Sequence, residues 1–177
     1  NSYGFEELRK KIGIVPQKAV LFKGSVRDNL LWGDAEATDG EIYDAIKTAQ
    51  ASDIIEAKGE GLDFTVEEGG KNLSGGQRQR LTIARALVGK PEILILDDSS
   101  SALDYQTDAK LRQALKNLDY NPTVFIVSQR TASLSHADRI IVLDDGKIVG
   151  IGKHEELISS CLVYSEIYNS QFRREDI

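Results

Sequence analysis

The sequence predicts an α/β fold in which parallel strands alternate with helices. Residues 93–96 form a continuous apolar run of strand length, which is typical of a strand buried in a parallel sheet. A helix is predicted from Ser74 onward and ends at residues 89–91, Gly-Lys-Pro. Residues 91–150 then alternate strands with a helix at 106–118. This alternation is the pattern of a parallel α/β sheet.

Capping and strand signals place further elements before and after this region. Thr38 and Glu41 form a capping box, which predicts that a helix begins there and covers residues 39–51. The run Thr-Val-Phe-Ile-Val at residues 123–127 predicts a second strand. One face of the predicted helix at 106–118 is apolar, through Leu111, Ala114, Leu115 and Leu118.

The last part of the chain is predicted to be a hairpin followed by helices. Residues 140–150 read as two strands, with Asp145 and Gly146 as the two-residue turn between them. The tail from Lys153 is predicted to be helical and to end in a solvated segment at 173–176. Its expected apolar anchors are Leu157, Ile158, Leu162, Tyr164, Ile167 and Tyr168.

The composition limits the kinds of function to consider. The 177 residues suffice for one domain with its own core, and the net charge of −6 argues against a nucleic-acid surface. The single cysteine, Cys161, excludes an internal disulfide and suits a reducing compartment. His136 and His154 have no partners at ligand spacing, so we expect no metal role for them. No run of about twenty apolar residues occurs, so we expect any membrane part to lie outside these residues.

Residues 73–80, Leu-Ser-Gly-Gly-Gln-Arg-Gln-Arg, place two glycines at the start of a predicted helix. Each glycine costs about 1 kcal/mol relative to alanine in a helix, so both need a reason such as the close approach of another group. Ser74 and Gln77 form a capping box. The free N–H groups of the first turn, the Ser74 hydroxyl and the bare backbone of Gly75 and Gly76 suit a phosphate. The capping box alone also fits an ordinary capped helix.

Two acidic residues, Asp97 and Asp98, follow the predicted strand at 93–96 directly. Ligands of open α/β sheets gather at the carboxyl ends of the strands. Carboxylates at that edge suit a magnesium ion and can orient a water molecule. The same two acids could also simply begin a loop.

These blocks resemble, in order and spacing, the motifs of ATP-binding cassette (ABC) ATPases. Residues 73–77 look like the signature motif, residues 93–97 like the magnesium-binding Walker B strand, and residues 101–104 like the D-loop. Residues 12–17, Ile-Gly-Ile-Val-Pro-Gln, resemble the strand that leads into the Q-loop. The resemblance covers essentially the whole chain. It implies a P-loop NTPase-like three-layer sandwich with a helical subdomain.

The resemblance also implies ATP and Mg²⁺ as cofactors and a role for each matching residue. Asp97 and Gln17 would bind the metal. Asp98, Gln17 and Gln129 would act in ATP hydrolysis. The expected nucleotide contacts are Ser74, Gly75, Gly76, Gln77 and Asp104. Within the domain at 1–177, the resemblance assigns residues 1–17 to the core sheet and Q-loop, 18–90 to a helical subdomain and 91–177 to the rest of the core.

Within the family, several segments are similar to exporters whose nucleotide-binding domain is fused to a transmembrane domain. Residues 21–30 after Gln17 match this branch, and residues 66–70 resemble its X-loop, although they also read as a plain turn. We therefore expect the parent protein to power transport at the cytoplasmic face of the cell membrane. Trp32 reads either as a packed anchor beside Leu30 and Leu31 or as a contact to the transmembrane domain.

The sequence contains no G-x-x-x-x-G-K-[ST] loop, which the family calls Walker A. The family places this loop before the position of Gln17, so we expect a domain truncated at its N-terminus. Without that loop the chain lacks the main electrostatic contribution to phosphate binding, and we expect weak ATP binding and no useful hydrolysis. The family sets the missing strand between residues 123–127 and 139–143, so self-association or strand exchange is also expected.

Two residues depart from the usual pattern of the family. Asp98 stands where most members have glutamate, and Gln129 stands in place of the switch histidine. A carboxylate drawn back by about an ångström can lower the rate about a hundredfold. Glutamine can still donate a hydrogen bond, but it cannot carry a proton as histidine does. Both changes resemble the degenerate subunit of bacterial heterodimeric exporters, although a homodimer also fits.

Two other functions fit parts of the sequence. One is a non-enzymatic interaction fragment, in which the signature helix and the D-loop serve as dimerisation surfaces. The other is a soluble ABC ATPase that acts on ribosomes or DNA. Its mark would be a basic arm or an inserted domain between Gln17 and Ser74, and neither is visible.

Overall fold

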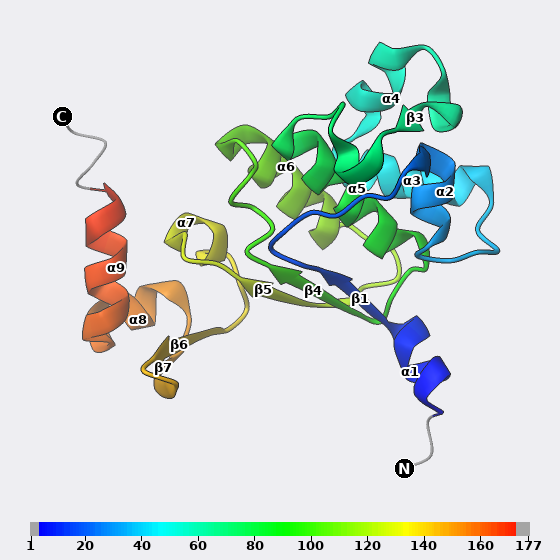
Figure 1. Ribbon diagram of the computed structural model, residues 1–177. Helices are drawn as coiled ribbons and strands as arrows, with labels where there is room; N and C mark the ends of the chain where they lie inside the picture. Colours follow the sequence, from blue (N-terminus) through cyan, green and yellow to red (C-terminus); the bar gives the residue numbers. More distant parts are fainter. Residues whose placement is uncertain (1–3, 173–177) are drawn as a thin grey trace. The chain divides into compact units, whose positions relative to one another are not determined.

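The computed structural model describes residues 4–172 and divides them into two compact units, one up to Val127 and one from Ser128. The first unit contains a three-stranded parallel sheet of β1 (Ile12–Val15), β4 (Ile93–Asp97) and β5 (Thr123–Val127), in the order β1-β4-β5 (Figure 1). The strands predicted at 93–96 and 123–127 are thereby confirmed. Because the strands are parallel, their carboxyl ends meet at one edge of the sheet.

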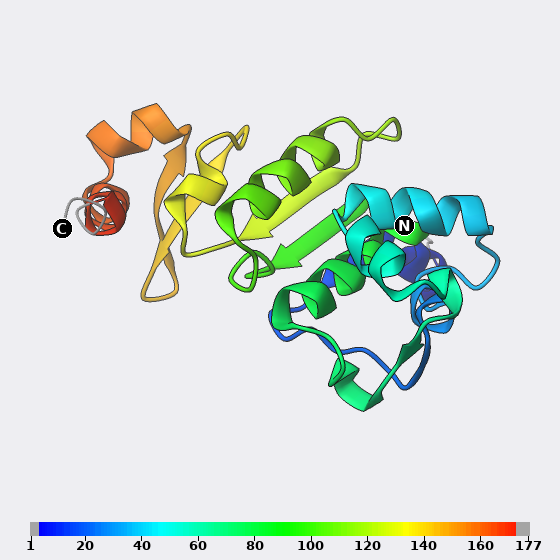
Figure 2. The same ribbon diagram turned by 90° about the horizontal axis from the view of Figure 1, so that it is seen from above.

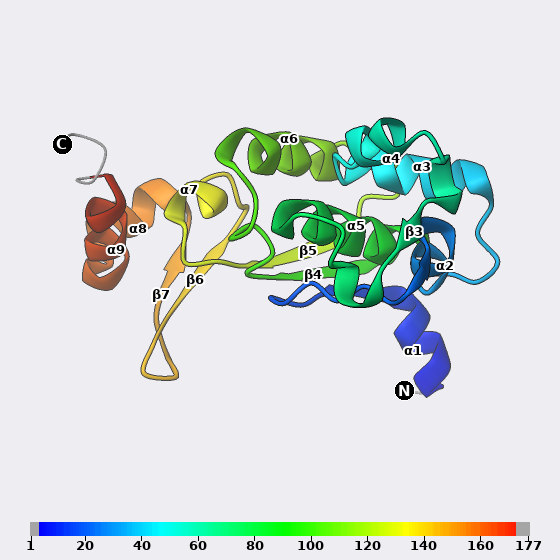
Figure 3. The same cartoon turned by 45° about the horizontal axis from the view of Figure 1, so that its top comes forward.

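One face of this sheet is covered by the helices α5 (Gly75–Val88) and α6 (Tyr105–Lys116) (Figure 3). Side chains alternate across the sheet, so Val15, Leu94 and Leu96 face these helices and are buried. Seen from above, α6 runs along β5, and its Leu111 and Leu115 join the same core (Figure 2). The opposite face stays apolar but open.

The open face of the sheet follows directly from the register of the strands. Ile14 pairs with Ile95, and Ile95 pairs with Phe125, so these three side chains form one row across the sheet. Ile14 is 59% exposed and Phe125 is 54% exposed. Val127 lies further along β5 on the same face and is 55% exposed. A parallel sheet normally has both faces covered, so this face is unusual.

Five short elements beyond α5, and α1, which leads directly into β1, complete the first unit. They are α1 (Phe5–Lys11), α2 (Val26–Leu31), α3 (Asp39–Thr48) and α4 (Ser52–Lys58), with the short 3-10 turns η1 (Gly61–Asp63) and η2 (Glu68–Gly70). Within the part of the chain between β1 and α5, β2 (Gly24–Ser25) and β3 (Thr65–Val66) pair as a two-stranded antiparallel sheet. Helices α2 and α3 pack on α5.

The capping box of Thr38 and Glu41 begins α3 as predicted. The helix ends at Thr48, earlier than the predicted residue 51. Gln50 adopts a φ of 58°, and a helix cannot continue through this left-handed conformation. The predicted helix at 106–118 is also confirmed, as α6, with ends that differ by one or two residues.

The second unit contains α7 (Thr131–Leu134), the hairpin strands β6 (Ile140–Asp144) and β7 (Lys147–Gly152), α8 (His154–Ser160) and α9 (Leu162–Phe172). The hairpin turn is the predicted one, since Asp145 and Gly146 have φ values of 44° and 73°. Its small core holds Ile140, Val142, Leu157, Cys161 and Tyr164. Among residues 4–172, no helix is long and apolar enough to cross a bilayer.

Two of the predicted anchors in the C-terminal tail are wrong. Leu162 is 74% exposed and Ile167 is 38% exposed. Leu162 starts a new helix after Cys161, which has an extended backbone, so the helical periodicity is reset between α8 and α9. Leu157 and Tyr164 are buried as predicted. The solvated segment predicted at 173–176 lies outside the described residues.

Candidate functional site at the carboxyl edge of the sheet

The carboxyl edge of the sheet brings Gln17 and Asp98 together. Gln17 lies just after β1, and Asp98 follows the last residue of β4. The Gln17 amide Nε2 donates a hydrogen bond of 3.2 Å to Asp98 Oδ2. Asp97, the final residue of β4, is exposed at the same edge. Three oxygen-bearing side chains therefore end the two neighbouring strands.

The backbone of Asp98 is held in a special conformation. Its φ is 43°, a left-handed value that aspartate tolerates better than most residues do. The Asp98 N–H donates to the Val127 carbonyl oxygen at 2.8 Å, and the Asp98 carbonyl accepts from the Ser101 hydroxyl at 2.8 Å. The backbone of Asp98, which carries the carboxylate, is thus hydrogen-bonded to the end of β5 on one side and to the loop after β4 on the other.

These donors suit a magnesium ion that is shared with a phosphate group. Mg²⁺ is usually held by one or two carboxylates together with water and substrate phosphates. The carboxylates of Asp97 and Asp98 and the Gln17 amide oxygen are of this hard-oxygen type. No group of three or more His, Cys, Asp or Glu residues among the described residues could hold a metal ion by itself. The donor set therefore fits a nucleotide-bound ion, in which the phosphates supply part of the coordination.

The start of α5 has the capping box that the sequence predicted. The Ser74 hydroxyl accepts from the Gln77 N–H at 3.2 Å, and Gln77 Oε1 accepts from the Ser74 N–H at 2.9 Å. Ser74 and Gly75 are both exposed. The exposed start of the helix can therefore be reached by an anion from another molecule, although the Gln77 N–H already donates to the Ser74 hydroxyl.

The two glycines of this turn have different explanations. A Cβ at Gly76 would lie 3.1 Å from the carbonyl oxygen of Ala102, so the loop between β4 and α6 packs closely against Gly76. The nearest group to a Cβ at Gly75 is the Arg78 guanidinium, 4.0 Å away. The close approach expected from the sequence is therefore internal at Gly76. Only Gly75 is left open to an external group.

Asp104, the last residue of the predicted D-loop, caps helix α6. Its Oδ1 accepts from the Thr107 N–H at 2.9 Å, and its Oδ2 accepts from the Thr107 hydroxyl at 2.7 Å. These two hydrogen bonds, the backbone one first, lower the pKa of Asp104. The structure therefore gives Asp104 a local structural task, and its expected contact to nucleotide stays a prediction.

The segment before Ser74 is a rigid turn tied to α5. Arg78 Nη1 donates to the carbonyl oxygens of Leu73 at 2.7 Å and Gly70 at 3.3 Å. Asn72 Nδ2 donates to the Thr65 carbonyl at 2.8 Å, and Asn72 Oδ1 accepts from the Glu67 N–H at 3.0 Å. Residues 66–70 therefore have one defined shape next to the signature.

Gln129 lies in the second unit. It is exposed, and its carbonyl oxygen accepts a hydrogen bond of 2.6 Å from Gln171 Nε2 in α9. This bond ties the backbone of Gln129, not its side-chain amide, to α9. Its expected action beside Asp98 stays a prediction.

Trp32 is not the packed anchor that one interpretation of the sequence gave. It is 70% exposed and stacks on Phe22, with ring centroids 4.7 Å apart and an angle of 25° between the planes. The two rings border a groove of ≈ 350 Å³, which also reaches Arg85 on α5. Sequence reasoning missed this groove because its residues come from separate elements with no common spacing.

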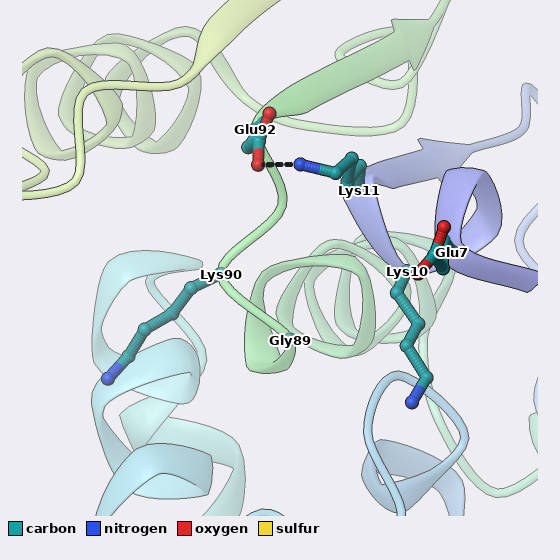
Figure 4. A pocket seen from close by; sticks show the side chains of 6 residues that line it. All are labelled: Glu7, Lys10, Lys11, Gly89, Lys90 and Glu92. Atoms are coloured by element: carbon teal, nitrogen blue, oxygen red, sulfur yellow. Dashed lines mark hydrogen bonds and ion pairs between the residues drawn. The ribbon is translucent and has the colours of Figure 1, made fainter. Parts of the chain in front are cut away.

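A second hollow, of ≈ 370 Å³, lies beside the groove and shares Lys10 and Gly89 with it. Two of its three lysines are paired with acids: Lys11 forms an ion pair with Glu92, and Lys90 Nζ lies 3.2 Å from Glu41 Oε1. Lys10 points away from the Lys11–Glu92 pair (Figure 4). These pairs leave the hollow little net charge with which to attract a ligand.

Comparison with known proteins connects these features. A sequence profile described as "ABC transporter" matches residues 2–101. An uncharacterized ABC transporter ATP-binding protein of Bacillus subtilis is 47% identical over 170 residues, which are 96% of this chain and 29% of that protein. A putative multidrug export ATP-binding/permease protein of Staphylococcus aureus is 43% identical over 164 residues, or 93% of this chain and 28% of that protein.

Among solved structures, a bacterial Atm1-family ABC exporter with ATP bound superposes with a TM-score of 0.89 at 35% sequence identity. The match covers 94% of this chain and 30% of the exporter chain. The fold described above is therefore that of an exporter's nucleotide-binding domain, a P-loop NTPase-type α/β fold. The chain spans about 30% of the length of the proteins it matches, as the first curated relative also shows, at 29%.

Proposed function

Because the chain belongs to the ABC transporter family, we propose that it serves an exporter as the part of a nucleotide-binding domain that carries the signature motif. In this function the chain works with ATP and Mg²⁺ and with a second nucleotide-binding domain. One observation supports the proposal most: the open first turn of α5, where Ser74 and Gly75 are exposed while the capping box keeps the turn in shape. A helix start of this kind is an anion site.

The signature serves the ATP site of the partner domain. Ser74 and Gly75 are exposed at one end of α5, Gly76 and Gln77 are half-buried beside them, and the sequence contains no G-x-x-x-x-G-K-[ST] loop to accompany them. A γ-phosphate held by the partner's own loop would complete the site. Asp104, behind the same turn, keeps the D-loop in place through its cap on α6.

The carboxyl edge of the sheet serves the chain's own, slower ATP site. Asp97 would hold the Mg²⁺, and Gln17 would contact the metal and the attacking water; its amide Nε2 donates a hydrogen bond to Asp98. Asp98 would orient the attacking water, and Gln129 would donate a hydrogen bond to the γ-phosphate. With an aspartate and a glutamine in these two roles, we expect slow hydrolysis at this site and a fully catalytic partner, as in a heterodimer; a homodimer with two slow sites is the alternative.

The membrane-embedded part of the transporter is the second expected partner. The Staphylococcus aureus relative is named an export ATP-binding/permease protein, and this chain covers 28% of it. The rigid turn at 66–70 and the exposed Phe22–Trp32 stack are the surfaces of the first unit that could meet such a part. The site of action would then be the cytoplasmic face of the cell membrane.

Titration calorimetry with Mg·ATP tests the proposal. The 177 residues contain no G-x-x-x-x-G-K-[ST] motif, so this chain alone should bind ATP weakly and hydrolyse none at a useful rate. A mixture with a domain that carries the loop but has its own signature serine changed to arginine should bind ATP more tightly than either component does. The Ser74→Arg variant of this chain should abolish that gain. Tight binding by the chain alone, or an equal gain with Ser74→Arg, would contradict the proposal.

A non-enzymatic interaction role is favoured by one observation, the open face of the sheet. Ile14 on β1 and Phe125 and Val127 on β5 expose apolar surface, and β5 is an edge strand of the sheet among residues 4–172. An uncovered apolar face and a free strand edge promote pairing with another chain. Light scattering should therefore show concentration-dependent self-association of the chain, and Phe125→Lys should weaken it. A monomer at all concentrations would rule out this role.

A further inference from the structure

The side chain of Gln171, near the end of α9, holds the loop that carries Gln129. Its Oε1 accepts two hydrogen bonds of 3.0 Å from Thr131, one from the backbone N–H and one from the hydroxyl. Its Nε2 donates a third, of 2.6 Å, to the carbonyl oxygen of Gln129. One amide group thereby binds residues on both sides of Arg130, which lie 40 and 42 positions earlier in the sequence.

These hydrogen bonds supply a cap that the local sequence does not provide. Arg130 is the N-cap residue of α7, and its side chain makes no capping hydrogen bond. In α3 and α5, by contrast, Thr38 and Ser74 cap the helices that they begin. The first N–H groups of a helix have no partner within it, and in α7 the Thr131 N–H finds its acceptor on Gln171. The start of α7 is therefore held by a distant side chain.

Burial makes the contact to Thr131 costly to lose. Thr131 is 2% exposed, so its N–H and its hydroxyl have little access to water. A buried donor that loses its acceptor destabilises the structure. On the other side of Arg130, the Ser128 hydroxyl accepts from the Arg130 N–H at 3.0 Å. The backbone of residues 128–131 is thus held at several points while Gln171 is in place.

The side chain of Gln129 stays available for a ligand. Gln129 is exposed, and the hydrogen bond from Gln171 uses its backbone carbonyl, so its side-chain amide keeps its donors. The position of that amide depends on the backbone that bears it. A displacement of about an ångström at a group that acts on the reacting atoms can cost about a hundredfold in rate.

We propose that Gln171 is a positioning residue for ATP hydrolysis, whose side-chain amide fixes the backbone of residues 129–131 and thereby sets where the Gln129 amide meets the γ-phosphate. The proposal rests on the proposed function in one respect, the action of Gln129 on that phosphate. Gln171 acts through Gln129 and not on the nucleotide itself. If the same hydrogen bonds served only to pack α9, their loss would not depend on the presence of the Gln129 amide.

Two variants separate the two tasks of the Gln171 amide. Gln171→Ala removes all three hydrogen bonds. Gln171→Glu keeps an acceptor for Thr131, but a carboxylate at neutral pH has no proton to donate to the Gln129 carbonyl. Asn169→Ala is the matched control, because Asn169 is exposed on the same helix and donates to Ser165 within that helix at 3.4 Å.

Amide hydrogen exchange of the 177-residue chain measures the hold on the loop without any nucleotide. The Thr131 N–H should exchange about tenfold faster in Gln171→Ala, because it loses its acceptor. Gln171→Glu and Asn169→Ala should stay close to the rate of the parent chain. Unchanged exchange in Gln171→Ala would show that Gln171 does not hold the loop, and would overturn the proposal.

ATP turnover of the complete transporter tests whether this hold matters for the reaction. In a heterodimer, the partner's catalytic carboxylate is replaced, so that only the site served by Gln129 turns over. Gln171→Glu should lower kcat about tenfold with the KM for ATP unchanged, because alignment is lost and not binding. Asn169→Ala should keep the parent kcat. In a Gln129→Ala background, Gln171→Glu should cause no further loss, because the two residues act as one unit.

The outcomes distinguish this proposal from the proposed function. Turnover that Gln129→Ala leaves unchanged would contradict the role of Gln129 in hydrolysis, and with it the effect of Gln171 on the rate. If Gln129→Ala slows turnover but Gln171→Glu does not, or if the two losses add, only the positioning role of Gln171 is overturned. The calorimetric test of the signature depends on neither residue.

Discussion

The two ends of α5 differ in how their polar groups are satisfied. At the first turn, Ser74 and Gln77 satisfy each other's backbone groups, and Arg78 ties the preceding loop to the helix. Near the last turn, Arg85 has a buried nitrogen without a partner and lies beside an open groove. The backbone of the first turn is thus capped within the chain, whereas the Arg85 side chain near the last turn, like the buried Gln79 Nε2 further up the helix, has a nitrogen without a partner.

This difference distinguishes two ways in which a surface can bind another molecule. The first turn offers backbone N–H groups in a fixed geometry, which needs no change in the protein when an anion arrives. The groove end carries an uncompensated charge, which a partner would relieve. We therefore expect substitutions at the first turn to act mainly on ligand binding, and substitutions at the groove end to act strongly on the stability of the chain itself.

The largest expected effect comes from Gly33 at the groove end. A Cβ there would lie 2.0 Å from the Arg85 carbonyl oxygen, which belongs to the backbone of α5 and cannot move aside. Gly33→Ala should lower the free energy of unfolding by about 3 kcal/mol or more, as measured by urea denaturation.

The matched control is Gly75→Ala at the first turn, where the nearest group to a Cβ is 4.0 Å away. This variant should be neutral or more stable by up to about 1 kcal/mol, because alanine favours the helix. Similar losses of stability in the two variants would show that the two ends of α5 are equally constrained.

Arg85→Met is expected to have the next largest effect, and in the opposite direction. The substitution removes a buried group that lacks a hydrogen-bond partner and keeps most of its apolar contacts. The free energy of unfolding should rise by about 1 kcal/mol. Arg80→Met is the contrasting variant, since it would leave Asp53 without its partner and should lower stability.

Features that depend on neighbouring residues could be predicted from the sequence. The capping boxes at Thr38 and Ser74 and the turn at Asp145 and Gly146 each involve residues within four positions. Their geometry is set by local hydrogen bonds, which require particular residue types at fixed positions in the sequence. The strand at 93–97 was predictable for a similar reason, since its apolar run is continuous.

Features that depend on distant residues could not be predicted in the same way. Gly76 is small because Ala102, from the loop after β4, packs against it. The contact between Gln17 and Asp98 joins two strands that are 81 residues apart. The resemblance to a family indicated that these two residues share a site, but the stacking of Phe22 on Trp32 had no signal in the spacing of either residue. Such contacts depend on how whole elements pack.

Removing the cap at the first turn should have a moderate effect on stability and a larger one on ligand binding. Ser74→Ala loses the hydroxyl that accepts from the Gln77 N–H. The expected loss of stability is about 1 kcal/mol, measured by urea denaturation. Ser74→Asp is the control, because aspartate also caps helices and should restore stability. It should not restore ATP binding in the mixture with a partner domain, since its negative charge repels the phosphate.

The smallest expected effect is a pH dependence at Asp104. The two hydrogen bonds from Thr107 favour the ionised carboxylate and lower its pKa in the folded state. A carboxyl group with a lowered pKa adds stability at pH values above the ordinary pKa of aspartate. That contribution is lost as the pH falls through the lowered value.

Asp104→Asn can still cap α6 through its amide oxygen, but it cannot titrate. The difference in unfolding free energy between the parent chain and Asp104→Asn should therefore be constant near neutral pH and should shift against the parent chain only in acid. Because Asp28 and Glu41, whose pKa values are also lowered by hydrogen bonds within their caps, are present in both proteins, their contributions cancel in this difference. A difference that stays constant down to strongly acidic pH would show that the Thr107 hydrogen bonds do not favour the charged form, and that Asp104 is free to serve a ligand.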